Sequence, residues 1–374
     1  MSWHISCTKT TARSSGRWLR AICPTGARAV RCCGTEQHHQ NIREGGRGMT
    51  IAEIASRAGV SKAAVSRYLN NGYVSSEKRE AIRRVIEETG YVPSQQAQTL
   101  RTGKSRMVGV IVPRIDSESI SRVVAGISRV LEEHDYHLLL ANTDNNIQKE
   151  LEYLEVFRSG NVDGVILVAT ILSGAHRQAL AALESPVVLV GQRMEGMTCV
   201  FHDDRGAAAA VTGLLLGGGR RRIGYIGVTP RDKAAGAARR AGWQDAMRAA
   251  GLEPDPAWME QSDFSIDGGY AAAGRLLARV PDLEGIFCAT DSIAIGAKKR
   301  LEEDGRRIPQ EIALAGIGHS RLSELVRPRI ATAHYYYQTS GEEAARDLLE
   351  MLEQGIDRKK QLMLGYEVHP GESV

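Results

Sequence analysis

The feature that most constrains this chain is a pair of short helical patterns in residues 50–70, TIAEIASRAGVSKAAVSRYLN. The first has apolar residues at the i, i+3, i+4, i+7 spacing of one helix face, namely Ile51, Ile54, Ala55 and Ala58. Gly59 ends it, and Ser61 can cap a second helix over residues 62–70. Two short helices joined by a glycine-containing turn predict a helix-turn-helix, whose second helix can lie in the DNA major groove. For the turn taken alone, a helical corner that binds nothing is the alternative.

The residues after the turn complete the pattern of a known family. Residues 77–89 predict a third helix with a buried face of Ile82, Val85 and Ile86. Together, residues 50–105 resemble the DNA-binding headpiece of the LacI family of bacterial regulators, the family of the lactose and galactose repressors. The resemblance extends to about Glu367. It implies an all-α helix-turn-helix headpiece with a hinge helix, followed by an α/β core of two lobes like that of periplasmic binding proteins.

The resemblance also implies which side chains meet DNA. In such headpieces a few side chains read base edges while other groups hold phosphates. The reading positions fall on Lys62, Ala63 and Arg67, of which Arg67 can fork onto a guanine for about 1–3 kcal/mol of discrimination. Supporting backbone contacts are expected from Thr50, Ser61, Ser66, Asn70 and Tyr91. For Ser66, the equally good alternative is a position on a solvent-exposed helix face without contact to DNA.

The hinge corresponds to residues 94–102, a segment that is short for a helix. Isolated helices below about 12–15 residues are marginal in water, so we expect this one to fold only when two hinges pair over bent DNA. The family's minor-groove wedge falls on Leu100, whose insertion costs unstacking energy that the extra protein–DNA contact offsets. The alternative is that Leu100 packs within its own domain.

Charge is distributed unevenly along the 374 residues. Residues 1–48 carry a net charge of +6 and residues 49–105 a net charge of +4, while the remainder carries −6. A basic small domain on an acidic large one is typical of a DNA-binding domain attached to a sensor domain.

No apolar run approaches the roughly 18 residues of a membrane span, so we expect a soluble, cytoplasmic protein. Residues 1–48 lack periodicity and are expected to be an untranslated or disordered leader before Met49, with a basic arm on DNA as the alternative.

From Met107 onward, short apolar runs alternate with helical patterns, which predicts parallel sheets covered on both faces. The predicted domains are the leader, a headpiece over 49–93, a hinge helix and linker over 94–105, and a two-lobed effector-binding and dimerisation domain over 106–374. The sequence ends at residues 365–368 with a short polar tail, and we find no leucine heptads there. The chain is therefore predicted to form a homodimer rather than a tetramer built on a coiled coil.

Candidate effector-binding residues follow the predicted strands, where open parallel sheets bind ligands. Arg114 and Ser117 lie in the segment PRIDSES after the first strand. The resemblance adds Arg239 as an effector-gripping arginine, Asp291 as an acceptor of sugar hydroxyls and Tyr335 as a pocket side chain. Arginine forks and carboxylates suit polyol recognition. Arg114, Arg239 and Asp291 could each belong to a structural ion pair instead.

The ligand is expected to be a sucrose-like disaccharide or its phosphate, with trehalose phosphate as a close alternative. Arg114 is a cation that suits a phosphorylated sugar, and PRIDSES resembles the corresponding loop of family members that sense disaccharide phosphates. The tract ATAHYYYQTSGEEAA resembles that of sucrose-operon-type repressors. This part of the expectation is analogy at the level of the family.

The predicted function is repression of a sugar-utilisation operon, with release from a palindromic operator by a sugar inducer. A regulator that uses a corepressor and a sugar-binding transport module are the alternatives. We find no Gly-x-Ser-x-Gly elbow, no phosphate loop and no paired metal ligands in the sequence, so we expect neither an enzyme nor a cofactor or metal.

Overall fold

The computed structural model of the chain describes residues 49–70, 72–91, 104–159, 162–355 and 359–374. The chain divides into two compact units, with the boundary between residues 92 and 93. The predicted leader, the hinge helix and its wedge Leu100 all lie outside the described residues.

The first unit is a bundle of three helices, α1 (Ile51–Arg57), α2 (Lys62–Leu69) and α3 (Ser76–Thr89). Its core contains Ile54, Val65 and Ile82, each fully buried. The turn between α1 and α2 passes through Gly59 at φ 64°, a left-handed conformation that glycine adopts without steric cost. The predicted helix-turn-helix and its third helix are therefore confirmed within one or two residues at each end.

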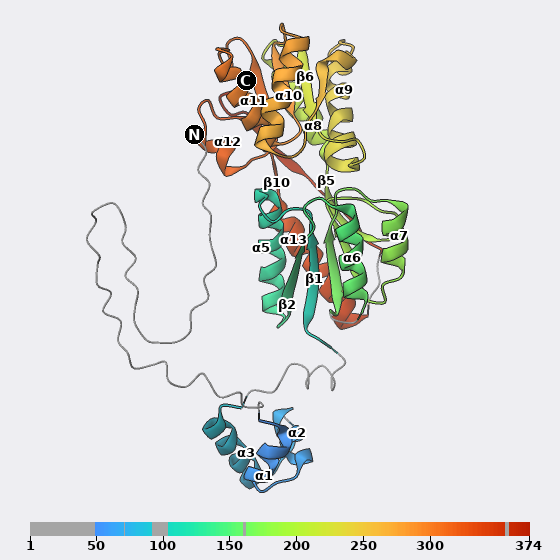
Figure 1. Cartoon of the computed structure of the whole chain (residues 1–374), viewed down its shortest axis with the longest axis vertical. Helices are drawn as coiled ribbons and strands as arrows, with labels where there is room; N and C mark the ends of the chain where they lie inside the picture. Colours follow the sequence, from blue (N-terminus) through green and yellow to red (C-terminus); the bar gives the residue numbers. More distant parts are fainter. Residues whose placement is uncertain (1–48, 71, 92–103, 160–161, 356–358) are drawn as a thin grey trace, which may run out of the picture. The chain divides into compact units, whose positions relative to one another are not determined.

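The first lobe of the second unit is a six-stranded parallel sheet between two helical layers (Figure 1). Helices α5 and α13 pack together on one face, and α6 and α7 pack on the other. Its strands have the order β11-β5-β4-β3-β1-β2. The strands are β1 (Met107–Val112), β2 (His137–Asn142), β3 (Gly164–Val168), β4 (Val187–Val190), β5 (Thr198–His202) and β11 (Gln361–Leu364), and the helices are α5 (Glu118–Glu133), α6 (Ile147–Arg158), α7 (Gly174–Ala181) and α13 (Tyr337–Gln354).

The second lobe repeats this plan with strands in the order β12-β10-β9-β8-β6-β7, of which only β12 is antiparallel to its neighbour among the described strands. Its helices pack in the pairs α8 with α9 and α10 with α11. The strands are β6 (Ile223–Gly227), β7 (Met259–Gln261), β8 (Gly285–Cys288), β9 (Ala313–Gly318), β10 (Ala331–Tyr335) and β12 (Tyr366–His369), and the helices are α8 (Asp204–Gly217), a π-helical turn η1 (Lys233–Ala238), α9 (Arg239–Ala249), a 3-10 turn η2 (Pro256–Trp258), α10 (Ile266–Arg279), α11 (Asp291–Glu303) and α12 (Arg321–Leu325).

The described chain crosses between the lobes three times, from β5 to α8, from β10 to α13 and from β11 to β12 (Figure 1). The two-lobed α/β core is thus confirmed, but the C-terminal segment that we expected to be a short polar tail belongs to the fold. Strand β12 begins at Tyr366, and Ser373 is buried with its hydroxyl donating to the carbonyl oxygen of Leu314 at 2.5 Å. Exposed and partly buried residues are mixed along β11 and β12, so neither strand has the continuous apolar run that predicts a buried strand.

The two helices on one face of the first lobe, α5 and α13, approach each other through glycines. A Cβ atom on Gly341 would lie 2.0 Å from the carbonyl oxygen of Val123, and one on Gly126 would lie 2.1 Å from that of Gln338. Both clashes involve backbone atoms, which cannot rotate away as a side chain can. The close packing of this helix pair therefore depends on glycine at both positions.

We expect Gly341→Ala to lower the free energy of unfolding of the core by about 1–3 kcal/mol or more, because the added methyl group must push α5 and α13 apart. Urea unfolding followed by circular dichroism measures the change. Gly213→Ala is the matched control, since Gly213 lies inside α8 with no atom within 4 Å of the new Cβ, and alanine there should be neutral or stabilising. Equal effects of the two substitutions would contradict this account.

Candidate nucleic-acid interface and effector cleft

The recognition helix α2 separates a buried face from an exposed one. Ala64 and Val65 are buried in the headpiece core, whereas Lys62, Ala63 and Arg67 are exposed. The helix therefore offers two cations and one small apolar group to solvent on the same surface. This is the arrangement that major-groove reading requires, although the assignment of these three residues to base contacts stays a prediction.

Two of the residues predicted to support DNA binding, Thr50 and Ser61, also cap the starts of helices α1 and α2. Thr50 and Glu53 form a capping box, in which the Thr50 N–H donates to Glu53 Oε2 at 2.6 Å and the Glu53 N–H donates to Thr50 Oγ1 at 3.3 Å. Ser61 Oγ accepts from the N–H of Ala64 at 3.2 Å. These caps use the side-chain oxygens that the predicted phosphate contacts would share.

The remaining supporting positions lie at the C-terminal ends of helices α2 and α3. Asn70 is exposed, and its Nδ2 donates to the carbonyl oxygen of Ser66 at 2.5 Å. Tyr91 follows Gly90, which ends α3 in a left-handed conformation at φ 60°. The structure therefore describes all the predicted DNA-contacting residues except Leu100.

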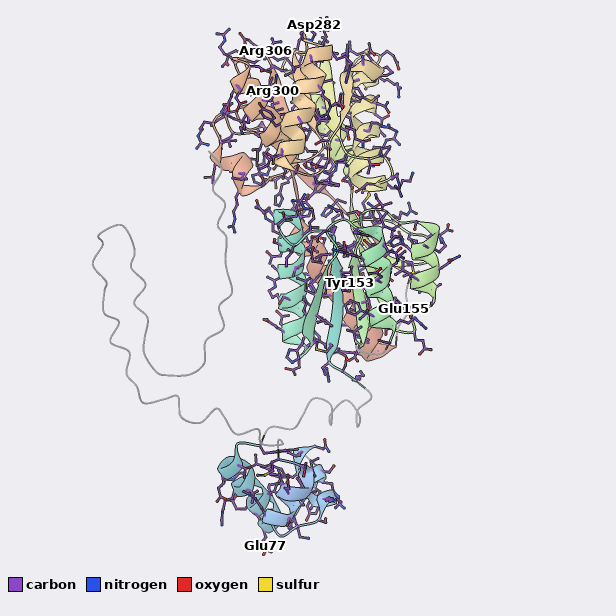
Figure 2. The ribbon with its side chains drawn as sticks, in the orientation of Figure 1. Glu77, Tyr153, Glu155, Asp282, Arg300 and Arg306 are labelled. Atoms are coloured by element: carbon purple, nitrogen blue, oxygen red, sulfur yellow. The ribbon has the colours of Figure 1, made fainter. Side chains whose placement is uncertain are left out.

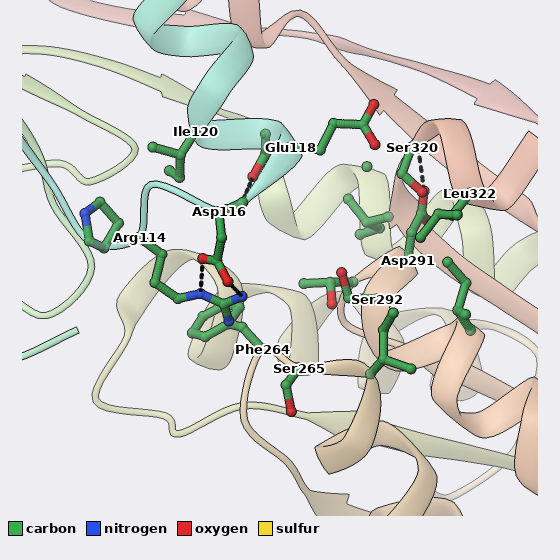
Figure 3. A pocket seen from close by; sticks show the side chains of 18 of the residues that line it. Arg114, Asp116, Glu118, Ile120, Phe264, Ser265, Asp291, Ser292, Ser320 and Leu322 are labelled. Carbon is green, nitrogen blue, oxygen red and sulfur yellow. Dashed lines mark hydrogen bonds and ion pairs between the residues drawn. The ribbon is translucent and has the colours of Figure 1, made fainter. Parts of the chain in front are cut away.

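A cavity of about 420 Å³ lies between the two lobes of the second unit (Figure 3). Its first-lobe wall is the loop after β1 and the start of α5, and its second-lobe wall is formed by the starts of α10 and α11 and the loop after β9. The volume falls in the range of pockets that hold small organic ligands. Its position beyond the carboxyl ends of the parallel strands is the one expected from the sequence.

Arg114 and Ser117, predicted from the segment after β1, both line this cavity. The Arg114 guanidinium forms a fork with Asp116, with Nε at 2.9 Å from Oδ1 and Nη2 at 3.1 Å from Oδ2. The hydroxyl of Ser117 lies 2.9 Å from that of Ser119. Arg114 therefore has an anionic partner from its own loop.

Asp291 also lines the cavity, but it is buried and its carboxylate is already hydrogen-bonded. Oδ2 accepts from the N–H of Ser320 at 2.7 Å, and Oδ1 accepts from the hydroxyl of Thr332 at 2.6 Å. Burial raises the pKa of Asp291, and the hydrogen bonds oppose that rise. The carboxylate thus ties the start of α11 to β10 and to the loop after β9, and its contact with a sugar hydroxyl stays a prediction.

Arg239 and Tyr335 are not among the residues that line this cavity. Arg239 starts α9 directly after the π-helical turn, and its Nε lies 2.7 Å from Asp204 Oδ1 while Nη1 donates to the carbonyl oxygen of Ala289 at 2.5 Å. The Tyr335 hydroxyl donates to the same oxygen of Asp204 at 3.1 Å. We call Asp204, Arg239 and Tyr335 the crossing cluster, because Asp204 begins α8 after the first crossing and Tyr335 ends β10 at the second.

Both effector assignments in the crossing cluster stay predictions, because neither Arg239 nor Tyr335 lines the cavity. The cluster contains a buried ion pair, with Arg239 7% and Asp204 7% exposed. Sequence reasoning missed Asp204 because the strand β5 that precedes it was not predicted. It also missed Asp116 and Glu118 as partners of the cleft arginines, although the i, i+4 spacing of Glu118 and Arg122 could have indicated their ion pair.

His202 packs against the crossing cluster at the end of β5. Its ring stacks on that of Tyr335 with the centroids 4.5 Å apart and the planes at 4°. Burial lowers the pKa of His202 to about 4, and the neighbouring Asp204 only partly opposes this shift. The imidazole is therefore neutral in the folded protein near pH 7.

Acidification should destabilise the core through His202. The folded pKa of about 4 lies below the ordinary value of 6.5, so the unfolded chain binds the proton first and stability falls as pH drops from 6.5 towards 4. The full loss is about 3 kcal/mol from this group. In urea unfolding between pH 7 and 4.5, His202→Phe, which keeps an aromatic ring on Tyr335, should flatten the pH dependence. His137→Gln, at an exposed histidine, controls for the loss of one imidazole, and an unchanged slope in His202→Phe would refute the assignment.

Comparisons with known proteins agree with this architecture. Residues 50–94 match the family model of bacterial regulatory proteins of the lacI family, and residues 212–374 match that of the periplasmic binding protein-like domain. The sucrose operon repressor of Staphylococcus xylosus is 33% identical over 306 residues, which cover 82% of this chain and 94% of that protein. The HTH-type transcriptional regulator CelR of Thermobifida fusca is 32% identical over 314 residues, covering 81% and 92%.

Solved structures give the same result. A complex of the transcriptional regulator CelR with cellobiose is 28% identical, with a TM-score of 0.68 over 87% of this chain and all of that one. The lac repressor dimer bound to operator and the anti-inducer ONPF is 20% identical and shows the shared fold, with a TM-score of 0.80 over 87% of this chain and 99% of that one. Within the described residues, no helix has the length and apolarity that a membrane crossing requires. On these matches, the chain belongs to the LacI family of bacterial transcriptional regulators, which are not enzymes.

Proposed function

We propose that this protein represses a sugar-utilisation operon by binding a palindromic operator as a homodimer, and that a saccharide bound between its lobes releases it. The observation that carries the proposal is the cavity of about 420 Å³ between two lobes that the chain joins by three crossings. A ligand in that position touches both lobes at once and can therefore change their relative position. The sucrose operon repressor and the CelR–cellobiose complex among its relatives favour a saccharide as the ligand.

The proposed domain assignment follows the sequence: headpiece 49–93, hinge helix and linker 94–105, and effector-binding and dimerisation domain 106–374. Within the headpiece, the exposed face of α2 would read bases through Lys62, Ala63 and Arg67. Thr50, Ser61, Ser66, Asn70 and Tyr91 would contact the backbone, and Leu100 would wedge into the minor groove. In the core, Arg114, Ser117, Arg239, Asp291 and Tyr335 are the proposed effector contacts.

Binding at the cleft and at the operator must be linked reciprocally. If a saccharide lowers the affinity for operator by some factor, operator DNA lowers the affinity for saccharide by the same factor. Fluorescence anisotropy on a labelled operator, titrated with saccharides, gives both the ligand and the sign of its effect. Release on addition of a saccharide supports the proposal, tighter binding would indicate a corepressor, and operator binding that no saccharide changes would overturn the regulatory role of the cleft.

We expect Arg67→Ala to reduce discrimination between the operator and a variant with one substituted guanine by about 1–3 kcal/mol, because the guanidinium fork is lost. Arg84→Ala is the matched control, since it removes the same charge from the exposed surface of α3. It should weaken binding to both duplexes by a similar factor. Anisotropy titrations on the two duplexes at one salt concentration measure the difference. If discrimination survives Arg67→Ala, the reading role of Arg67 is refuted.

A further inference from the structure

We infer that the cleft selects an uncharged saccharide and discriminates against its phosphorylated counterpart. This inference rests on the proposed function and narrows the class of ligand that the cleft accepts.

The charged residues that line the cavity have an acidic balance. Two are cations, Arg114 and Arg122, and four are acids, Asp116, Glu118, Asp267 and Asp291, which gives −2 with all groups ionised. A phosphate ester carries about −1.5 to −2 at pH 7, so it meets net repulsion from this wall.

Neither arginine of the cleft offers an unneutralised charge. Asp116 binds Arg114 through two parallel contacts, and the guanidinium holds the pKa of this carboxyl below its ordinary value, which keeps it ionised. Arg122 Nη2 lies 2.5 Å from Glu118 Oε1, and Arg122 Nη1 donates to the carbonyl oxygen of His319 at 3.3 Å. Figure 3 shows the Arg114–Asp116 pair at one side of the cavity. A phosphate would have to displace a resident carboxylate from either arginine before pairing with it.

Five helices have their first turn or their N-cap on the cavity wall, and helix N-termini attract anions. Four of them have a carboxylate in the first turn, namely Glu118 in α5, Asp267 in α10, Asp291 in α11 and Glu324 in α12, whereas α13, which begins at Tyr337, has none. Ser265 and Thr290 also cap α10 and α11 by accepting from the N–H groups of Gly268 and Ile293. The positive ends of four of the five helices are therefore compensated by the protein's own carboxylates, which weakens the attraction of the cavity for a phosphate.

The rest of the wall suits a neutral polyol. Hydroxyl and amide groups surround the cavity, and they can both donate to and accept from sugar hydroxyls. Aromatic and aliphatic side chains provide apolar surface for the C–H faces of sugar rings. The polar group includes Ser117, Asn145, Thr170 and Ser292, and the apolar group includes Phe264, Ile295, Leu322 and Tyr337.

The test uses matched pairs of ligands on the full chain: sucrose and sucrose 6-phosphate, trehalose and trehalose 6-phosphate, and cellobiose and cellobiose 6-phosphate. Isothermal titration calorimetry at pH 7.5 and constant ionic strength measures each affinity. For any pair that binds, we expect the neutral member to bind at least about tenfold more tightly, because like charges on the ligand and the wall repel. Equal or tighter binding of the phosphorylated member would overturn the inference while leaving the proposed function standing.

A charge variant tests the cause. Asp116→Asn releases Arg114, so it should narrow the preference for the neutral sugar by several-fold, mainly by improving binding of the phosphate. Asp282→Asn is the matched control, because Asp282 pairs with Arg222 and lies away from the cavity at the outer end of the second lobe (Figure 2). Retained operator binding shows that each variant is folded.

Three outcomes decide the inference and the proposed function separately. A preference that narrows in Asp116→Asn but not in Asp282→Asn supports the inference. A preference unchanged in Asp116→Asn would refute its charge basis. If neither member of any pair binds while operator binding is intact, the proposed carbohydrate function fails, and the inference fails with it.

Discussion

The ion pair between Asp204 and Arg239 is the constraint on which the two-lobed core depends. Asp204 stands where the chain leaves the first lobe, and the same carboxylate oxygen accepts a hydrogen bond from Tyr335, where the chain returns. The pair is almost fully buried. A buried ion pair adds little net stability over an apolar replacement, but removing one partner typically costs about 3–5 kcal/mol. The crossing cluster therefore holds the crossing from β5 to α8 beside the crossing from β10 to α13.

Two physical patterns limited how much of the fold could be predicted from the sequence. Buried strands such as β1 and β3 are continuous apolar runs, so their existence and parallel arrangement followed from the chain alone. Strand β5, with the polar ends Thr198 and His202, has no such run, and β11 is half exposed. The headpiece was predictable in more detail because its turn depends on local chemistry, the glycine at 59 and the cap at 61.

The candidate site was less predictable because its electrostatics depend on tertiary contacts. From the sequence alone, Arg114 was predicted to lie at the cleft, and its positive charge favoured a phosphorylated ligand. The fork with Asp116, two residues away, depends on how the loop turns after β1, and no periodicity encodes that. Likewise, Asp291 follows a strand in sequence, but Ser320 and Thr332, which occupy its oxygens, come from other parts of the lobe.

The contacts around the cleft relate ligand charge to lobe position. Glu118 on the first lobe accepts from the N–H of Arg321 on the second at 3.1 Å, and Arg122 donates to the carbonyl oxygen of His319. These links involve partly exposed groups, so they are weaker constraints than the buried crossing cluster. The residues that neutralise charge at the cleft therefore also join its two walls. An anionic ligand would compete with Glu118 for Arg122 and break this link, whereas a neutral ligand can bind with the link intact.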